Sequence, residues 1–228
     1  MRCYLFTSSC LLAAFALLSH GILVAGQETK PVIDVGIYYE SLCGDSMRFI
    51  RDQLLPSYPL LKNHLKITFV PYGKASRWQD AETGPWHFTC QHGTAECRGN
   101  MAQACAIDAI MAEESPENVQ QLSVALVGCA MSSRYPPTAV PRCAEEANLK
   151  EETRNRITHC IDNGTMSDSL HAEHGVKTSA LDPPLTFVPT VTINGAYTRD
   201  TQSEILNRFF KTMCALLPAT SKPSECNE

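Results

Sequence analysis

Residues 32–46 read VIDVGIYYESLCGDS, a stretch that joins a predicted strand to a predicted helix through one cysteine. Residues 32–39 are rich in β-branched and aromatic side chains, which favours a strand. After Cys43, apolar side chains recur at helical spacing up to a proline: Met47, Ile50, Leu54 and Pro56. The stretch therefore places a cysteine where a strand ends and a helix begins, and Ser46 follows three positions later.

The chain continues with a second strand and a long helical region. Residues 66–71 (KITFVP) predict a buried strand, so the chain begins with the order βαβ. From about Cys97 to His174 the apolar residues recur at helical spacing, and no strand is predicted there. This long helical region separates the first two strands from the rest of the sheet.

Three helices are predicted within this region. The first carries Cys97 and Cys105, the second begins at Ser115 as its N-cap, and the third runs from about 142 to 162 and stops at Asn163. On one helix, Cys97 and Cys105 would be about 12 Å apart along the axis. That distance exceeds the reach of a disulfide, so we expect each to tie the insertion to another segment.

The β signal returns near the C-terminus. Residues 187–193 (FVPTVTI) predict a strand, and the Asn-Gly pair that follows predicts a two-residue turn into a return strand starting at 196–198. Thr201 and Glu204 form a capping-box pattern for a last helix, which ends before Pro218. The end of the chain thus adds ββα.

The summed order is βαβ, a helical insertion and ββα. This order predicts an α/β, thioredoxin-like fold that is interrupted by a disulfide-stapled helical insertion. The core is expected at about 31–75 and 183–218 and the insertion at about 76–182, within a single domain of residues 27–228.

Residues 1–26 have the layout of a secretory signal peptide. Arg2 precedes an apolar run over residues 4–18, and small residues follow as far as Gly26. A membrane anchor is the alternative reading, but the run is shorter than the about 20 residues that span a bilayer. The sequence therefore predicts a secreted (extracellular) or lysosomal protein that does not insert into the membrane.

Eleven cysteines are present, and nine remain once the predicted signal peptide is removed. This number in a secreted chain indicates a disulfide framework. Because nine is odd, one sulfur is left over, and Cys43 is the leading candidate for a free thiol. Partial pairing or a disulfide-linked dimer also satisfies the parity, so monomer and dimer stay open. The disulfide candidates are Cys90, Cys97, Cys105, Cys129, Cys143, Cys160, Cys214 and Cys226.

The charged residues exclude some partners. The mature chain has 18 basic and 24 acidic residues, a net charge of −6. No basic stripe marks a surface for nucleic acid or anionic lipid. Asn163 begins the only glycosylation sequon, and we expect it to carry a glycan in a secreted chain.

The sequence CQHGTAECRGNMAQAC at residues 90–105 matches C-Q-H-G-x2-E-C-x2-N-x4-C at every specified position. On this motif the chain resembles the gamma-interferon-inducible lysosomal thiol reductase family. The resemblance continues through residues 38–43, 70–73 and 188–195 and covers essentially the whole mature chain. It implies a thioredoxin-like fold and the reduction of protein disulfides in acidic endolysosomal compartments by a Cys-x-x-Cys pair. Disulfide-containing proteins or other protein partners are the ligands that it implies.

The resemblance assigns the attacking sulfur to Cys43 and the resolving position to Ser46. The start of a helix stabilises a thiolate, whereas the charge of Asp45 disfavours it, and Cys43 paired with another cysteine is the alternative. A resolving thiolate attacks the mixed disulfide at very high effective concentration, which the far more basic serine hydroxyl cannot do. Three outcomes stay open: resolution by an external thiol such as glutathione, long-lived mixed disulfides, or a non-catalytic binding protein (a pseudo-enzyme).

Pro189 corresponds to the position where the thioredoxin fold places a cis-proline facing the reactive cysteine, with a trans proline as the alternative. If the bond is cis, Val188 would present its backbone to an extended substrate segment. Val188 and Pro189 are therefore the predicted substrate-binding residues.

Histidines offer metal ligands in two places. His171-x-x-His174, with His159 and Cys160 upstream, is more typical of a solvated helix face than of a zinc site. For His92 and its neighbouring cysteines, disulfide pairing is the better explanation in an oxidising compartment. We expect no metal, and no cofactor other than an external thiol such as glutathione.

Overall fold

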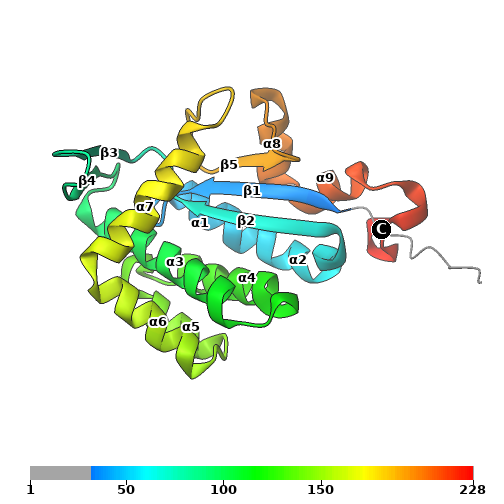
Figure 1. The fold of residues 1–228 in the computed structure, drawn as a ribbon. Helices are drawn as coiled ribbons and strands as arrows, with labels where there is room; N and C mark the ends of the chain where they lie inside the picture. Colours follow the sequence, from blue (N-terminus) through cyan, green and yellow to red (C-terminus); the bar gives the residue numbers. More distant parts are fainter. Residues whose placement is uncertain (1–31, 228) are drawn as a thin grey trace, which may run out of the picture.

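The computed structural model describes residues 32–227, and its centre is a three-stranded sheet in the order β2–β1–β5 (Figure 1). β1 runs parallel to β2, with Ile33 opposite Leu65, and antiparallel to β5, with Ile37 opposite Val191. The strands are β1 (Ile33–Tyr39), β2 (Leu65–Pro71) and β5 (Thr190–Ile193). The predicted signal peptide lies outside the described residues.

The helix after Cys43 crosses from β1 to β2 and is longer than predicted. It does not end at Pro56: a π-helical turn precedes this proline, and the helix continues to Leu61. A π-helical turn inside an α-helix is one of the few recognised causes of a helix irregularity. The ring of Phe49 packs edge-on against that of Phe209, with 5.6 Å between centroids, which holds the start of the helix against the core. The three segments are α1 (Gly44–Phe49), η1 (Ile50–Leu54) and α2 (Leu55–Leu61).

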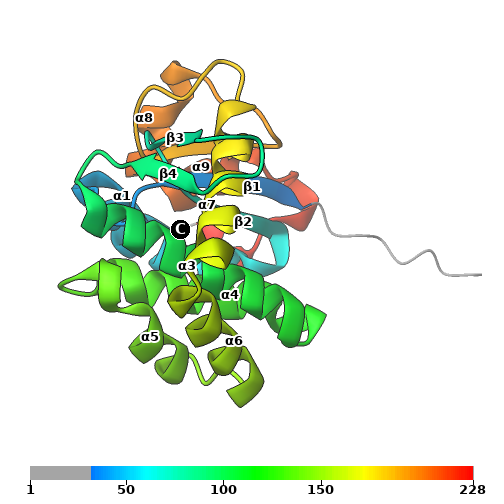
Figure 2. The same cartoon turned by 60° about the vertical axis from the view of Figure 1, so that its left-hand side comes forward.

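The insertion opens with a β-hairpin that the sequence did not predict. Its two strands, β3 (Ser76–Gln79) and β4 (Trp86–Thr89), pair antiparallel with Arg77 opposite Phe88. Both are four residues long and only partly buried, so they carry little of the apolar alternation that identifies a strand. The hairpin lies beside α7 (Gly164–Ser179) in two views of the molecule (Figures 1 and 2).

The predicted third helix is in fact two helices. The chain turns between them at Asn148, which has a φ of +52°, a left-handed conformation that asparagine tolerates better than most residues. A further helix, α7, starts directly after Asn163, whose side chain caps it. The remaining helices of the insertion are α3 (Thr94–Glu113), α4 (Pro116–Ser132), α5 (Val140–Glu146) and α6 (Glu151–Asp162).

The C-terminal part also differs from the predicted ββα. The Asn-Gly turn forms, but the return strand is reduced to a single bridge between Ile193 and Ala196. The next helix is capped by Thr198, whose hydroxyl accepts a hydrogen bond from the backbone N–H of Thr201 at 3.3 Å, so the capping-box prediction was three residues late. The helix breaks at Arg208 into α8 (Arg199–Asn207) and α9 (Phe209–Leu216).

Four disulfides staple the described structure, three of them within the insertion. Cys105–Cys160 joins α3 to α6, Cys129–Cys143 joins α4 to α5, and Cys90–Cys97 closes the loop before α3 onto its first turn. Cys214–Cys226 holds the C-terminal segment against α9. As expected, Cys97 and Cys105 do not pair with each other. Both bonds nevertheless remain inside the insertion, whereas we expected them to reach other segments.

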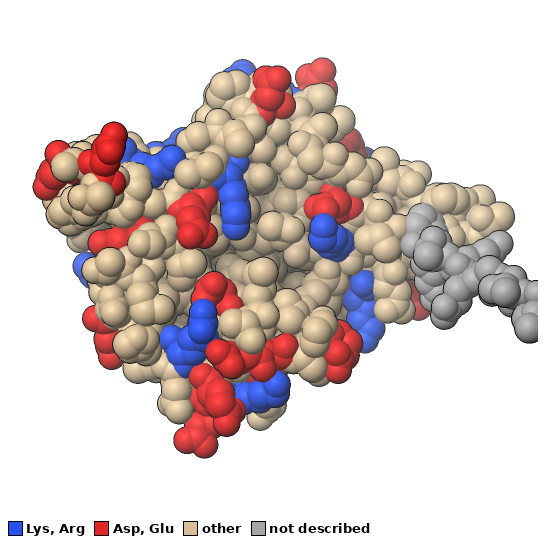
Figure 3. Space-filling view, in the orientation of Figure 1, with Lys and Arg blue, Asp and Glu red and all other residues tan. Residues whose placement is uncertain are grey.

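The charged side chains on one face of the molecule are mixed in sign. On the face shown in Figure 3, basic and acidic side chains are interspersed, most densely over α5 and α6. Among the described residues, no helix combines the length and the apolar character required to cross a membrane.

Candidate active site at Cys43

Cys43 lies where β1 gives way to α1, as the sequence predicts. Its backbone is extended, with φ −72° and ψ 119°, and it is the N-cap residue of α1. Its carbonyl accepts the first helical hydrogen bond, from the N–H of Met47 at 3.0 Å, and its own N–H donates to the carbonyl of Glu40 at 3.3 Å. The side chain is only 9% exposed, at the positive end of the helix dipole.

Cys43 is the one cysteine of residues 32–227 that is outside a disulfide. The other eight cysteines of this part of the chain form the four bonds described above. The alternative in which Cys43 is paired within the chain is thereby excluded for this structure. A free thiol at a helix start is the group that thiol–disulfide exchange needs, whereas burial of that thiol limits its access to a target disulfide.

The segment before β5 faces this thiol. The Val188–Pro189 peptide bond is cis, as expected from the resemblance, and the Cys43 thiol donates to the Val188 carbonyl with 3.7 Å between Sγ and oxygen. The Asp182–Pro183 bond is cis as well, which was not predicted. Residues that are 145 positions apart in the chain therefore meet at the sulfur.

The hydroxyl of Ser46 hydrogen-bonds to the loop before α1. Its side chain is completely buried, and its hydroxyl accepts a long hydrogen bond, 3.5 Å, from the backbone N–H of Glu40. The hydroxyl therefore supports the loop between β1 and α1. Asp45, the residue expected to oppose a thiolate, forms an ion pair with Arg48, and both of these side chains are largely exposed. Exposure and pairing weaken the influence of the Asp45 charge on the sulfur.

A groove of about 430 Å³ runs alongside the site. One wall comes from the first turns of the helix after Cys43 and the other from the cis-proline segment and the end of α8. Its wall residues are both charged and apolar: Asp45, Arg48, Phe49, Asp52, Gln53, Phe187, Val188, Pro189, Leu206 and Asn207.

The family motif at residues 90–105 holds the Cys43 loop through its second half. The backbone N–H of Ser41 donates to Asn100 Oδ1 at 2.8 Å, and the Ser41 hydroxyl donates to the carbonyl of Glu96 at 3.1 Å. Gly99 makes this contact possible, since a Cβ there would overlap the Ser41 hydroxyl and lie 2.9 Å from Ser41 Cβ. The motif was recognised from the sequence, but its role in holding this loop could not be.

An acidic cluster beside the loop was missed as well. Glu40 and Glu96 are fully buried, and both approach the half-exposed ring of His92. Burial raises the pKa of the Glu40 carboxyl, the hydrogen bond from the N–H of Lys74 lowers it, and the charge of Glu96 raises it further. The four-residue spacing of His92 and Glu96 could have indicated that those two meet. Nothing in the sequence could have placed Glu40 beside them, because it lies 56 positions before Glu96.

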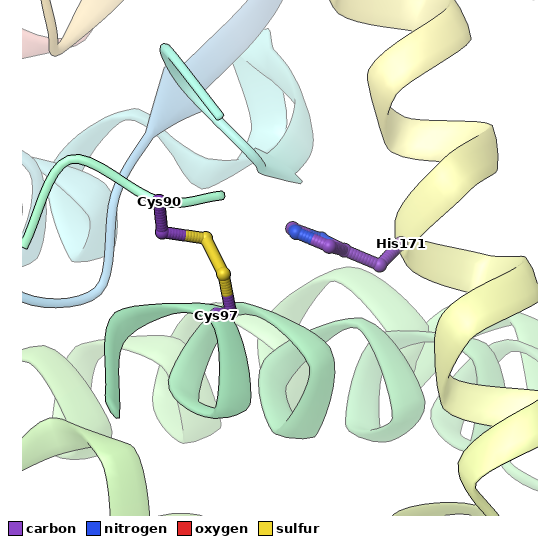
Figure 4. A group of neighbouring side chains, drawn as sticks. All are labelled: Cys90, Cys97 and His171. Atoms are coloured by element: carbon purple, nitrogen blue, oxygen red, sulfur yellow. A yellow bond between two sulfur atoms is a disulfide. The ribbon is translucent and has the colours of Figure 1, made fainter. Parts of the chain in front are cut away.

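The prediction that His171 and His174 lie on a solvated helix face was wrong. Both side chains are buried, because α7 lies under the β3–β4 hairpin. The ring of His171 contacts Tyr72 and Phe88, with centroids 4.8 and 4.6 Å apart, and it points toward the Cys90–Cys97 disulfide (Figure 4). Burial lowers the pKa of His171 to about 4 and that of His174 to about 3. Cys160 does not join them as a ligand, since it is bonded to Cys105, and His159 belongs to none of the clusters of metal-ligand residues within 32–227.

Asn163 lies between α6 and α7. Its side-chain oxygen accepts a hydrogen bond from the N–H of Met166 at 3.3 Å, so it acts as the N-cap of α7. The asparagine is partly exposed.

Comparison with known proteins identifies the family. The profile described as gamma interferon inducible lysosomal thiol reductase (GILT) matches residues 34–147. The chain is 36% identical to a gamma-interferon-inducible lysosomal thiol reductase-like protein of Anopheles gambiae, over 97% of this chain and 88% of that protein. It is 33% identical to the gamma-interferon-inducible lysosomal thiol reductase of Carassius auratus, over 86% of this chain and 72% of that protein.

Solved structures are similar in fold only. The Chlamydia trachomatis DsbA structure matches with a TM-score of 0.50 at 13% identity, covering 82% of this chain and 88% of that one. MdbA, a thiol-disulfide oxidoreductase from Actinomyces oris, gives 0.51 at 12% identity, covering 85% and 83%. These matches confirm the predicted thioredoxin-like α/β fold with its disulfide-stapled insertion. With its sequence relatives, its motif and this fold in agreement, the chain belongs to the gamma-interferon-inducible lysosomal thiol reductase family.

Proposed function

We propose that this protein is a secreted or endolysosomal glycoprotein in which Cys43 attacks protein disulfides and Ser46 leaves the resulting adduct unresolved. One observation carries this proposal. The only thiol among the described residues lies at a helix start facing Val188, while the hydroxyl at the resolving position hydrogen-bonds to the loop. Ordinary dithiol reductase activity is accordingly weak or lost.

The reaction starts as in any thiol–disulfide exchange. The Cys43 thiolate attacks one sulfur of a target disulfide, the target's S–S bond breaks, and the second target sulfur leaves as a thiolate. The target is now joined to Cys43 through a mixed disulfide. An external thiolate such as glutathione that attacks Cys43 Sγ releases the target as a thiol and leaves glutathione on Cys43. A second glutathione restores the Cys43 thiol and leaves as oxidised glutathione.

Val188 and Pro189 are the proposed contacts for the target. An extended segment that binds along this edge would compete for the Val188 carbonyl, which accepts from the Cys43 thiol at present. The adjoining groove offers space for side chains of the target, and its mixture of charged and apolar walls suits a polypeptide better than a small apolar ligand.

Reduction of insulin disulfides with excess glutathione tests the exchange chemistry. We expect slow turnover that increases with glutathione concentration and is abolished in Cys43→Ala. Equal rates for the wild type and Cys43→Ala would contradict an oxidoreductase role.

The alternative is a non-catalytic protein that engages a partner through the same scaffold. The serine at position 46 and the burial of Cys43 favour it. It predicts that binding of a partner is unchanged in Cys43→Ala, whereas the exchange proposal predicts loss of covalent capture in that variant.

The proposed location and modification rest on other features. Four disulfides are consistent with a location outside the cytosol. Cleavage of residues 1–26 and a glycan on Asn163 are checked by the mass of the secreted protein before and after deglycosylation, with Asn163→Gln as the control. The same sample, run with and without reductant, distinguishes a monomer from a disulfide-linked dimer.

A further inference from the structure

We propose that Glu40, His92 and Glu96 form a binding site for a divalent transition-metal cation, next to the Cys43 loop and independent of thiol exchange. One ligand atom from each residue lies within 4.8 Å of the other two. The three residues come from the end of β1, the loop before α3 and the first turn of α3.

The distances place the imidazole between the two carboxylates. His92 Nδ1 is 2.5 Å from Glu96 Oε2 and 3.6 Å from Glu40 Oε2. The backbone N–H of His92 donates to the other Glu96 oxygen at 3.0 Å, which fixes that carboxylate against the loop. One nitrogen and two oxygens therefore converge on one point from fixed backbone positions.

The second observation is an unpartnered oxygen aimed at this point. Glu40 is 0% exposed, and its Oε2 has no hydrogen-bond partner, whereas Oε1 accepts from the N–H of Lys74 at 2.7 Å. A buried, unpartnered carboxylate oxygen is costly, and a second buried carboxylate beside it adds repulsion. Lys74 is the lysine whose charge acts on Glu40, and its backbone N–H is bonded to Oε1 and leaves Oε2 free. A divalent cation would satisfy the free oxygen and neutralise both acids.

The Glu40 side chain is held in place. Gly73 has a φ of +61°, and a Cβ there would overlap the Glu40 side chain and come within 2.8 Å of its carboxyl carbon. The carboxylate is thus packed against the turn after β2, where the N–H of Lys74 also holds its Oε1. Fixed ligands of this kind bind a metal without the cost of ordering them.

The ligand set indicates the class of ion. An imidazole with two carboxylates and room for water is typical of Zn²⁺ and related first-row cations, which take three protein ligands at open sites. The 41% exposure of the His92 side chain provides the entry side. Two other groups of metal-ligand residues among residues 32–227 each include two cysteines, and those sulfurs are already bonded to each other.

Zinc titration by calorimetry tests this site. The sample is the secreted protein with its disulfides intact and with Cys43→Ser, so that no free thiol competes for the metal. At pH 7 we expect one Zn²⁺ per chain. Glu40→Gln, Glu96→Gln and His92→Gln should each weaken binding by at least about tenfold. Affinity should also fall between pH 7 and pH 5, because protons compete for the same ligands.

His87→Gln is the matched control. His87 Nε2 lies 3.0 Å from Asp80 on the exposed hairpin, so it offers a similar His–carboxylate pair without the third ligand. Zinc affinity in this variant should equal that of the parent. If Glu40→Gln does not fold, the half-exposed His92 still decides the outcome. No stoichiometric binding, or binding that is unchanged in His92→Gln, would overturn the proposal.

Discussion

At the scale of single residues, the proposed function depends on the serine at position 46, three residues after Cys43. The Cys43 thiol and the Val188 carbonyl meet at 3.7 Å, which is the contact on which the proposed attack by Cys43 rests. Ser46, which the proposal assigns to the resolving position, is completely buried. The sequence alone was sufficient to identify this difference, because both residues belong to one local segment.

Ser46→Cys should restore the missing step. The new thiolate would attack the mixed disulfide at high effective concentration, so a pre-reduced sample should reduce a target disulfide at least about tenfold faster than the wild type without added thiol. Single-turnover release of the fully reduced target from its mixed disulfide with Cys43 measures this rate. Cys43→Ala combined with Ser46→Cys is the control and should remain inactive.

Gly99→Ala should destabilise the Cys43 loop. The added methyl group meets Ser41, whose N–H and hydroxyl bind the first turns of α3. We expect a loss of about 1–3 kcal/mol in the free energy of unfolding by urea. Gly164→Ala is the matched control, because no atom lies within 4 Å of its added Cβ, and it should be neutral or slightly stabilising. Equal effects of the two substitutions would contradict this packing role.

At the scale of elements, local signals in the sequence predicted the helices and strands that they mark. Features that depend on packing between distant segments were not predicted. β1, β2 and the start of α1 follow from apolar runs and spacing. The β3–β4 hairpin was missed because its short strands are half-exposed, and the split of the third helix depends on one left-handed residue, Asn148. The environment of His171 depends on the hairpin packing over α7, which no pattern within α7 itself reveals.

His171 and His174 should make the packing of α7 sensitive to acid. Burial lowers the pKa of His171 to about 4, and the positive charge of Arg77 contributes in the same direction. The pKa of His174 falls to about 3 through burial and the charges of Lys177 and His171. In the unfolded chain a histidine titrates near 6.5. Above that pH, protonation of the two histidines therefore does not change the free energy of unfolding. Below it, the unfolded chain binds protons first, and the folded state loses stability until the pH reaches the folded pKa.

His171→Phe should reduce this acid sensitivity. At pH 5 the unfavourable contribution of His171 is about 2 kcal/mol, and phenylalanine cannot take up the proton. Urea unfolding at pH 7.5 and pH 5 should therefore show a smaller loss for the variant than for the wild type. His159→Gln, on the exposed side of α6, is the control. A loss in His171→Phe equal to that of the wild type would contradict the role of the buried imidazole.

At the scale of the whole molecule, the family motif predicted more than the patterns did. The thioredoxin-like fold followed from the order of the predicted elements as well as from the resemblance, whereas the cis bond before Pro189 followed from the resemblance alone. The odd cysteine count pointed to Cys43 as the free thiol, but eight cysteines allow 105 pairings, so the actual bonds could not be chosen. The meeting of Glu40 with His92 and Glu96 also depends on how distant segments fold together.

The central claim is that Cys43 forms a mixed disulfide that the protein cannot resolve by itself. Intact-mass analysis after incubation with a disulfide-containing peptide, without any external thiol, tests it most directly. We predict one peptide bound per chain through Cys43, stable until glutathione is added, and rapid loss of that adduct in Ser46→Cys. The absence of an adduct on the wild type, or its spontaneous release at the rate of Ser46→Cys, would contradict the claim.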